Sequence, residues 1–499
     1  MSASVTGAVV SFLGTKQRGW LICSASLVVV GAVFYVAVSQ VRSAAYAARL
    51  PPLPELSGQP TAVRDHLREA DKFARARPMS VDAVGALGLA YHADMFYDQA
   101  DHVYGMVEEL SGFAWHWTYY RALAQGMRGL TDGLNMGLRQ VVEAAPGFGP
   151  AWWRLGETEF KAGRYERASD AWRHALTLAE PASSSDQAAP ARVPSAPVSA
   201  YAALGLARLA MMQGRTKYAL ELLEEVTEGT PGFGPAVRLL GDVYARLDRV
   251  QDAERATQVA DRLSPYESYL DPLTEALIHE SRSTTFLLQQ AATVDLTTNA
   301  AWREYLVRRA LEFDPDHLEA LYDLATMFRM LRRYDEALEL LEDFRRRQPD
   351  NFQILADIGQ CLWGLRRYAE AEEVLRRALE NLDNADTRNG LGLVLDQVGR
   401  PREAVVEYRR ALERNPNHLG ALSNLGAALV GQGQSNEAIR QFERLVALDP
   451  GDPDAQTSLG VVLAMVGLYE QAERVFRQAL HFDPSHEEAR SRLSQIELR

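Results

Sequence analysis

The sequence predicts an all-α protein, a solenoid of about eleven helix-turn-helix repeats preceded by one transmembrane helix. Two observations lead to this prediction. A pattern with a period of 34 residues covers residues 81 to 486, and residues 20 to 38 form an uncharged apolar run. A chain of 499 residues is too long for one ordinary compact core, whereas stacked repeats suit this length because each repeat packs only on its neighbours.

Composition and charge exclude several classes of function. Hydrophobic residues make up 47% of the chain and charged residues 24%, proportions typical of a folded protein. The 53 basic and 66 acidic residues leave a net charge of −13, which argues against binding to duplex nucleic acid. Two cysteines, Cys23 and Cys361, cannot build a disulfide framework or a cysteine-rich zinc site.

The apolar run at residues 20 to 38 is long enough for a helix of roughly 28 Å that crosses a bilayer. We therefore expect a transmembrane signal-anchor helix over residues 18 to 42, after a short tail at 1 to 17. A cleavable signal peptide is the alternative, since Ala45-Tyr46-Ala47 would serve as a cleavage site.

Basic residues flank the apolar run almost equally, with Lys16 and Arg18 before it and Arg42 and Arg49 after it. The amino-terminal amine adds one charge to the first group, so the positive-inside rule favours an amino terminus in the cytoplasm. Only four of the 53 basic residues are lysine, a bias typical of GC-rich bacterial genomes. We expect a single-pass protein of a bacterial inner membrane whose soluble part is periplasmic, raised on a proline-rich spacer and lead-in helix at 43 to 80.

Positions 8, 20 and 32 of the 34-residue unit hold the same types of residue in most repeats. The eighth is glycine or alanine in all eleven units, and the twentieth is alanine in all but two. Small residues let two helices approach closely, and proline cannot enter the interior of a helix. Each unit therefore consists of a helix, a turn, a second helix and a stop. The thirty-second position is proline in eight units, namely Pro146, Pro231, Pro265, Pro315, Pro349, Pro416, Pro450 and Pro484.

The period breaks at two places, and these breaks predict the domain organisation. Residues 181 to 199, rich in proline, serine and alanine, are expected to form a disordered insertion. Residues 268 to 283 are expected to form a helical adaptor. The adaptor separates an amino-terminal array of five repeats at 81 to 267 from a carboxyl-terminal array of six at 284 to 486. A capping helix is expected at 487 to 499.

Three stretches carry a family resemblance: WRLGETEFKAGRYERASDAWRHAL at 153 to 176, SNLGAALVGQGQSNEAIRQFERLVALDP at 423 to 450 and TSLGVVLAMVGLYEQAERVFRQALHFDP at 457 to 484. They resemble tetratricopeptide repeats. The resemblance implies a right-handed superhelix in which the first helix of each repeat lines a concave groove. Such grooves commonly bind peptide segments or partner helices.

The resemblance places positions 2, 5, 9 and 12 of each first helix in this groove. In the amino-terminal array these positions hold Tyr119, Trp153, Phe160 and Tyr201, which would suit an apolar or aromatic segment. In the carboxyl-terminal array they hold the more polar set Tyr322, Gln353, Gln360, Trp363, Asn389 and Asp396. Alternatively, the aromatic side chains fill the narrow inner curve of the superhelix or cover the adaptor helix.

Motifs for catalysis are absent from the sequence. No HExxH, P-loop, G-x-S-x-G or complete dinucleotide fingerprint occurs, and the repeats leave no stretch for a catalytic domain. Cys361 falls on a repeat helix and is interpreted as a buried structural thiol. We expect no enzyme activity, no metal, no cofactor and no small-molecule substrate.

These observations predict a membrane-tethered scaffold that binds protein partners in its groove during envelope assembly, secretion or maturation. An accessory subunit of a membrane enzyme complex, such as a polysaccharide synthase or a cytochrome maturation complex, is the alternative. In that case catalysis would belong to another chain.

Overall fold

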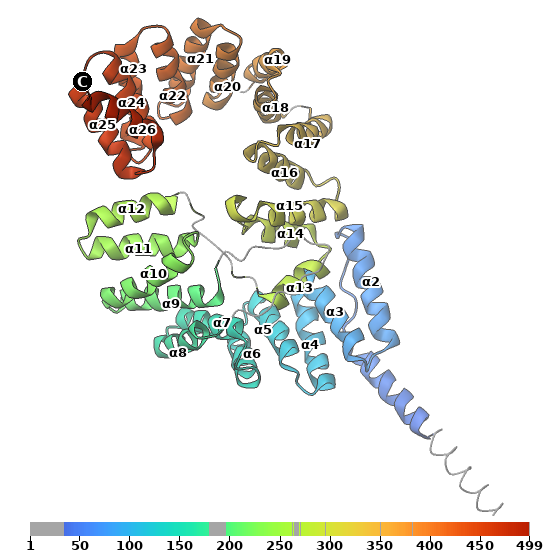
Figure 1. Ribbon diagram of the computed structural model, residues 1–499. Coiled ribbons are helices and arrows are strands. Elements are labelled where there is room, and N and C mark those ends of the chain that lie inside the picture. The colour runs from blue at the N-terminus through green and yellow to red at the C-terminus, as the bar shows by residue number, and fades with distance from the viewer. Residues whose placement is uncertain are drawn as a thin grey trace, which may run out of the picture. The chain divides into compact units, whose positions relative to one another are not determined.

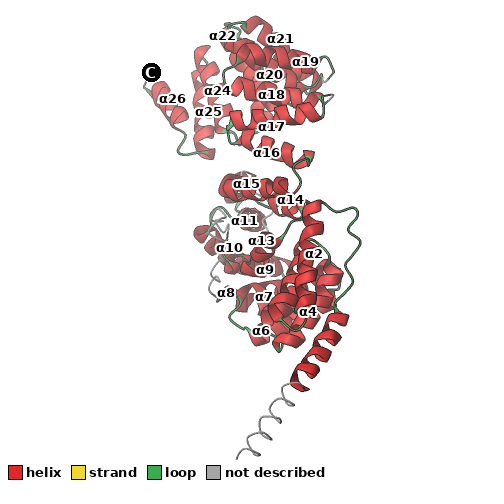
Figure 2. Cartoon of the chain, turned by 90° about the vertical axis from the view of Figure 1, so that its right-hand side faces the viewer, coloured by secondary structure: helices red, strands yellow, loops and turns green. Residues whose placement is uncertain are grey.

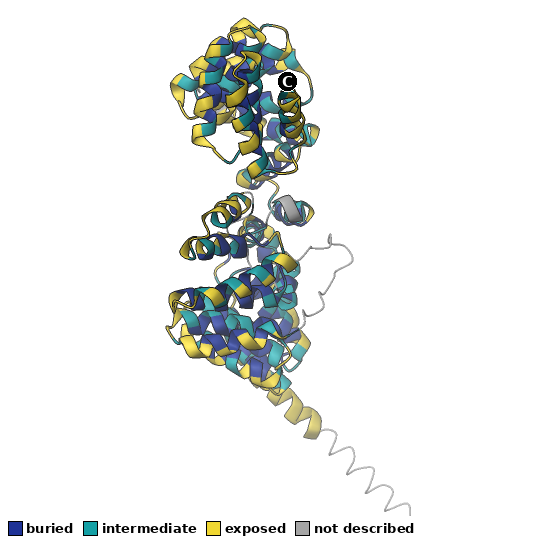
Figure 3. Cartoon of the chain, turned by 60° about the vertical axis from the view of Figure 1, so that its left-hand side comes forward, coloured by how far each residue is buried: buried dark blue, intermediate teal, exposed yellow. Residues whose placement is uncertain are grey.

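A computed structural model describes residues 34–178, 196–261, 263, 269, 271–294, 296–349, 351–381 and 383–498. Every regular element in this part of the chain is a helix (Figures 1 and 2). Successive helices pack as pairs: first α3 with α4, α5 with α6, α7 with α8 and α11 with α12, and later α16 with α17 and each following pair to α24 with α25. The all-α prediction is therefore confirmed, and buried residues gather on the faces where helices meet (Figure 3).

The predicted membrane span falls mainly outside this description. Residues 34–38 belong to a helix that runs over residues 34–49, whereas residues 20–33 of the span lie outside the described residues. Among the described helices, none has both the length and the apolarity that crossing a bilayer requires. The transmembrane helix therefore stays a prediction.

The chain divides into two compact units. The first comprises residues 1–186, 196–209 and 269–290, and the second comprises 187–195, 210–268 and 291–499. This division differs from the predicted boundary at the adaptor in two respects. The adaptor segment from residue 269 onward belongs to the first unit, and residues 210–268, which the prediction placed almost entirely in the amino-terminal array, belong to the second. Most of the predicted insertion lies outside the described residues, but Val198 and Ser199, which the sequence assigned to it, begin a helix.

Besides the helix over residues 34–49, ten labelled helices in the described part of the chain lie wholly or mostly in the first unit. Their bounds are α2 Thr61–Ala76, α3 Val81–Ala93, α4 Tyr97–Ser111, α5 Trp115–Met127, α6 Thr131–Ala144, α7 Gly149–Lys161, α8 Tyr165–Leu176, α9 Val198–Met212, α13 Pro272–Glu280 and α14 Thr284–Ala292.

The remaining labelled helices lie in the second unit. Their bounds are α10 Thr216–Gly229, α11 Gly234–Arg246, α12 Val250–Asp261, α15 Leu296–Phe313, α16 Leu318–Met330, α17 Tyr334–Arg347, α18 Phe352–Gly364, α19 Tyr368–Leu379, α20 Ala385–Gln397, α21 Pro401–Arg414, α22 Leu419–Gly431, α23 Ser435–Leu448, α24 Pro453–Met465, α25 Tyr469–Phe482 and α26 Glu487–Glu497.

The small residue at position 8 packs against a large side chain from the second helix of its own repeat. A Cβ built on Gly426 of α22 would lie 2.7 Å from Cζ of Phe442 in α23. In the last repeat, a Cβ on Gly460 would lie 2.6 Å from Cε1 of Phe476. The sequence pattern predicted a close approach of the two helices from positions 8 and 20. The structure adds the ring at position 24 that fills the space beside position 8.

The turn between the two helices of a repeat uses one left-handed residue at position 15. Glycine takes this conformation without steric cost, and other residues take it at a cost. Its φ is +60° at Arg366, +59° at Arg332 and +73° at Gly433. Ten repeats follow this rule, through Met95, Gly129, Gly163, Gly214, Asp248, Arg332, Arg366, Gly399, Gly433 and Gly467.

Three histidines begin helices at the junctions between repeats. Nδ1 of His418 accepts a hydrogen bond of 2.9 Å from the backbone N–H of Ala421, and Nε2 lies 3.0 Å from Oδ1 of Asp386 in the preceding repeat. His317 and His486 accept from Ala320 and Ala489 in the same way. These side chains satisfy backbone donors that a helix start leaves unpaired.

Candidate functional site

The inner face of the first unit is the surface where the predicted residues Tyr119, Trp153 and Tyr201 meet. These residues come from the first helices α5, α7 and α9. The surface is occupied by the chain itself. Tyr269 and residues 271–283, which we call the internal segment, lie on it, and the helix of this segment, α13, contacts α3 (Figure 1).

A fully buried carboxylate anchors the start of the internal segment. Oδ2 of Asp271 accepts a hydrogen bond of 2.7 Å from the hydroxyl of Tyr119 and one of 3.0 Å from Arg154. Arg154 also donates to the Tyr119 hydroxyl over 2.8 Å. The Asp271 side chain is therefore bonded to two groups of the array, which offsets the cost of burying its charge.

The same aspartate caps α13. Oδ1 of Asp271 accepts from the backbone N–H groups of Leu273 and Thr274, at 3.1 and 3.0 Å, and the Thr274 hydroxyl accepts from the backbone N–H of Asp271. The result is a capping box with proline at the first helical position. The hydroxyl of Tyr120 donates to the carbonyl of Leu273 over 3.0 Å. The array thus holds the short helix at its first turn.

Aromatic and apolar contacts hold the rest of the internal segment. The ring of Tyr269 lies 5.2 Å from those of Trp153 and Tyr201, between centroids, in edge-to-face arrangements. Such pairs add to the gain from burying their area. Leu277 is 3% exposed and belongs to the same buried cluster as Leu87 of α3.

The other end of α13 carries an ion-pair network. Nδ1 of His66 lies 2.8 Å from Oδ2 of Asp94, and its Nε2 lies 2.9 Å from Oε1 of Glu280. Burial of His66 disfavours the cation, but the hydrogen bonds to the two carboxylates outweigh it and raise the pKa of His66 to about 9. Asp94 also accepts from the backbone N–H of Arg282, and Ser281 donates to the carbonyl of Ala93.

The structure therefore changes the prediction for the amino-terminal array. Tyr119 and Tyr201 are buried rather than open to solvent, because the internal segment covers them. This is the arrangement that the alternative interpretation describes. Phe160 does not join the group. Its ring packs on Tyr165 and Trp172, both of the second helix α8.

Several residues of this site were not predicted, namely His66, Asp94, Tyr120, Arg154 and Asp271. One of them had a signal in the sequence. Asp271-Pro272 combines a favoured N-cap residue with proline at the first helical position, so the start of α13 was predictable. The partners of the carboxylate were not, because Tyr119 lies 152 positions earlier in the chain.

The second unit presents a different inner face, formed by α16, α18, α20 and α22. On this face α18 contacts α20, and α20 contacts α22. Side chains of adjacent first helices are hydrogen-bonded across the repeats. The hydroxyl of Tyr322 donates to Asp357 over 2.9 Å, and the amide of Asn424 donates to that of Asn389 over 2.9 Å.

The other predicted residues of this face differ in their exposure. Gln353 is exposed, Trp363 is half-buried, and Gln360 accepts a hydrogen bond of 2.8 Å from Arg329. Asp396 is turned toward its own repeat, where it accepts from the hydroxyl of Tyr408 over 2.9 Å. Burial raises the pKa of both Asp396 and Asp357 above the ordinary carboxylate value. Side chains from four repeats thus form one partly exposed polar surface.

Family models identify the repeats. A model described as tetratricopeptide repeat matches residues 204–268, 300–343 and 322–386, and a second model of the same description matches residues 397–461. These parts of the chain are tetratricopeptide repeats. The helix pairs that precede them, α3 to α8, have the same alternation of helix, turn and helix in the structure.

Several solved structures resemble parts of the chain. YrrB, described as a tetratricopeptide repeat protein with an unusual peptide-binding site, is 25% identical, covers 37% of this chain and 96% of its own, and has a TM-score of 0.30. MamA is 22% identical, covers 32% and 95%, and has a TM-score of 0.30. PilF of Pseudomonas aeruginosa is 19% identical, covers 42% and 97%, and has a TM-score of 0.37. No curated protein sequence matches the chain significantly.

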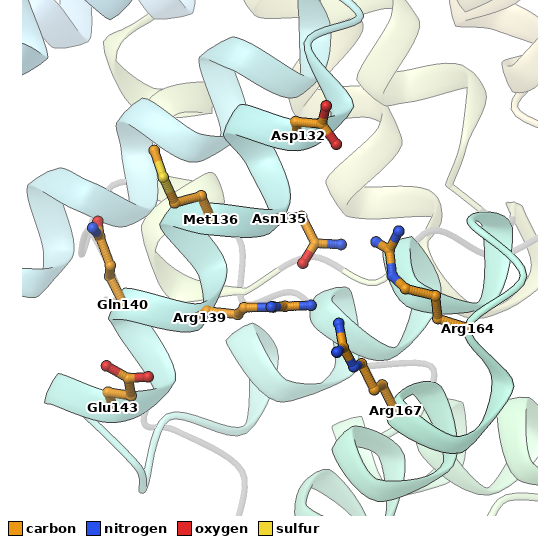
Figure 4. A pocket seen from close by; sticks show the side chains of 8 residues that line it. All are labelled: Asp132, Asn135, Met136, Arg139, Gln140, Glu143, Arg164 and Arg167. Carbon is orange, nitrogen blue, oxygen red and sulfur yellow. The ribbon is translucent and has the colours of Figure 1, made fainter.

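A pocket of about 320 Å³ lies between α6 and α8, the second helices of two successive helix pairs (Figure 4). Arg139 and Arg164 both pair with the single carboxylate of Glu159, which is 1% exposed. The lining adds one more arginine, Arg167, and two more carboxylates, Asp132 and Glu143, so three arginines meet three carboxylates. The pocket therefore has no large excess of either charge. Its lining comprises Asp132, Asn135, Met136, Arg139, Gln140, Glu143, Arg164 and Arg167.

The described repeats offer no centre for metal or thiol chemistry. No group of three or more His, Cys, Asp or Glu side chains in this part of the chain could hold a metal ion. Cys361 is fully buried in α18, and burial raises the pKa of its thiol to about 12. The thiol is therefore protonated and inert at neutral pH.

Proposed function

We propose that the chain is a membrane-tethered scaffold that binds a segment of a protein partner on the inner face of its second unit. The observation that carries this proposal is the set of side chains held by hydrogen bonds between successive first helices, above all Asn389 with Asn424. These side chains are partly exposed and fixed in place. The face is therefore ordered before a partner arrives, which lowers the entropic cost of binding.

The chemistry of this face suits an extended segment. The hydrogen bond between Asn389 and Asn424 leaves both N–H donors of Asn389 and the carbonyl oxygen of Asn424 with unused capacity. Gln353 adds another exposed amide, one repeat before Asn389. Amides can bond to the N–H and C=O groups of a partner's main chain. Binding of this kind is tolerant of sequence, as a scaffold requires.

A photo-crosslinking amino acid tests this site. Placed at Asn389 or Gln353, it should capture a partner, whereas at Glu413, an exposed residue of the second helix α21, it should not. Asn424→Ala should reduce capture at Gln353 without changing the melting temperature. Equal capture at Asn389 and Glu413 would contradict the proposed face.

The membrane tether rests on the apolar run at residues 20–38 and is tested separately. The full chain should stay in the membrane fraction after carbonate washing, and a chain without residues 1–42 should not. Protease added to spheroplasts should digest the repeats if they are periplasmic. Protection of the repeats in intact spheroplasts would contradict this orientation.

We infer a role in envelope assembly, secretion or maturation from the combination of tether and scaffold. The identity of the chain captured at Asn389 distinguishes this role from that of an accessory subunit. A membrane enzyme captured in stoichiometric amount would favour the accessory role.

A further inference from the structure

The internal segment occupies the inner face of the first unit as a bound ligand would. Its helix, α13, has nine residues, a length at which an isolated helix is not stable in water. Its sequence lies outside the 34-residue pattern that pairs the helices of the repeats. Its order therefore depends on the surface that holds it.

The surface recognises the segment through specific groups at both ends. Tyr119 and Arg154 bind the carboxylate of Asp271, and His66 binds that of Glu280. The side chains of Tyr119 and Asp94 are buried. Removing the segment without a replacement would leave these polar groups with fewer partners, which is costly. The surface therefore favours an occupied state.

We propose that the internal segment is an exchangeable ligand and that the inner face of the first unit is a second binding surface for a partner helix of the same chemistry. The partner carries an aromatic residue two positions before an aspartate that caps a short helix. Apolar residues follow the aspartate by two and six positions, and a carboxylate follows it by nine, as Leu273, Leu277 and Glu280 follow Asp271. The acidic groups at the two ends of this partner helix would pair with Arg154 and His66 of the surface, as Asp271 and Glu280 do.

Competition between the two ligands determines when a partner binds. A tethered ligand has an effective concentration of about millimolar. A partner in solution therefore binds weakly until the internal segment is loosened or the partner's local concentration is high. Concentrating the chain and its partner on one membrane would meet the second condition. This inference does not depend on the proposed site in the second unit, which crosslinking at Asn389 tests independently.

The experiment measures binding of a fluorescent peptide with the sequence of residues 268 to 284 to the full chain. The internal segment is weakened by Tyr269→Ala together with Leu277→Ala, which removes two contacts with the array and leaves the Asp271 cap in place. We expect this variant to bind the peptide at least about tenfold more tightly than the wild-type chain, because more of its surface is open. A matched peptide with Asp271→Ala should bind at least about tenfold more weakly, since Tyr119 and Arg154 then lose their acceptor.

Absence of peptide binding to a variant whose α3, α5 and α7 keep their protection from hydrogen exchange would overturn the proposal. If the variant does not fold, the wild-type chain provides the second measurement. Millimolar peptide should then accelerate hydrogen exchange in residues 271–283 and leave α22 unchanged. Unchanged exchange in residues 271–283 would overturn the proposal. A wild-type dimer that the peptide dissociates would support it, because the same segment would be bound in trans.

Discussion

The hydroxyl of Tyr119 lies 2.7 Å from Oδ2 of Asp271, although the two residues are 152 positions apart in the sequence. Both side chains are fully buried. This hydrogen bond joins the first helix of one repeat to a segment that belongs to no repeat. A hydrogen bond to a buried carboxylate is stronger than one between neutral groups, so this contact helps to fix the start of the internal segment on α5.

Replacing Tyr119 by phenylalanine should loosen the internal segment. Tyr119→Phe keeps the ring and removes one donor from the Asp271 carboxylate, so the expected loss of stability is about 1–3 kcal/mol. Hydrogen exchange in residues 271–283 should rise, because this segment loses an anchor. Urea unfolding followed by tryptophan fluorescence measures the loss. Tyr165→Phe, at an exposed position of α8, is the control and should change neither quantity.

The fold was largely predictable because a repeat multiplies a weak signal. A single glycine such as Gly426 does not predict any particular structure. Glycine or alanine at position 8 of every repeat, however, indicates that two helices cross closely there. The ring that fills the crossing, Phe442, was not assigned to it, since position 24 holds different side chains in different repeats. Tyr408 and Leu375 occupy the same place beside Gly392 and Gly359.

The candidate site was less predictable than the fold. Repeat positions indicated which side chains point inward, and Tyr119, Trp153 and Tyr201 do lie together. Whether a partner or the chain itself covers them depends on Asp271, whose docking place is set by contacts between distant parts of the sequence. In the second unit the pairing of Asn389 with Asn424 follows from the stacking of adjacent repeats, and no sequence pattern marked it beforehand.

Adding a methyl group at Gly426 should overpack one helix crossing. The Cβ of Gly426→Ala would lie 2.7 to 2.9 Å from three ring atoms of Phe442, so we expect a loss of about 1–3 kcal/mol. Hydrogen exchange should rise in α22, α23 and the adjacent repeats, since each repeat contacts only its neighbours. Gly431→Ala, at the end of the same helix, meets no atom within 4 Å and should be neutral or slightly stabilising. Equal destabilisation by both changes would contradict this packing.

Placing glycine at Arg366 should stabilise the second unit. Arg366 has a φ of +60°, a conformation that costs a side chain about 1–2 kcal/mol and costs glycine nothing. Glycine also increases the entropy of the unfolded chain, so the net gain is expected to be up to about 1 kcal/mol. The reverse change at the equivalent position, Gly433→Ala with a φ of +73°, should destabilise by a similar amount. Thermal melts of the two variants should therefore shift in opposite directions from the wild type.

The contact between His66 and α13 should weaken in alkali. The pKa of His66 is raised from its ordinary value of 6.5 to about 9, because hydrogen bonds to Asp94 and Glu280 outweigh the effect of burial. The folded state therefore holds a proton that the unfolded chain releases near pH 6.5. The stabilisation from this proton is complete below pH 6.5 and is lost as the pH rises through about 9.

The measurement compares wild type with His66→Gln by urea unfolding at several pH values from 6 to 10. Glutamine keeps a polar side chain but cannot carry the charge, so the variant should be less stable than the wild type at pH 6. The difference should shrink steadily between pH 6.5 and about 9, since the wild type loses its own charge in that window. His481→Gln, at an exposed position of α25, should follow the wild type at every pH. A difference for His66→Gln that stays constant across this range would show that His66 contributes by shape and not by charge.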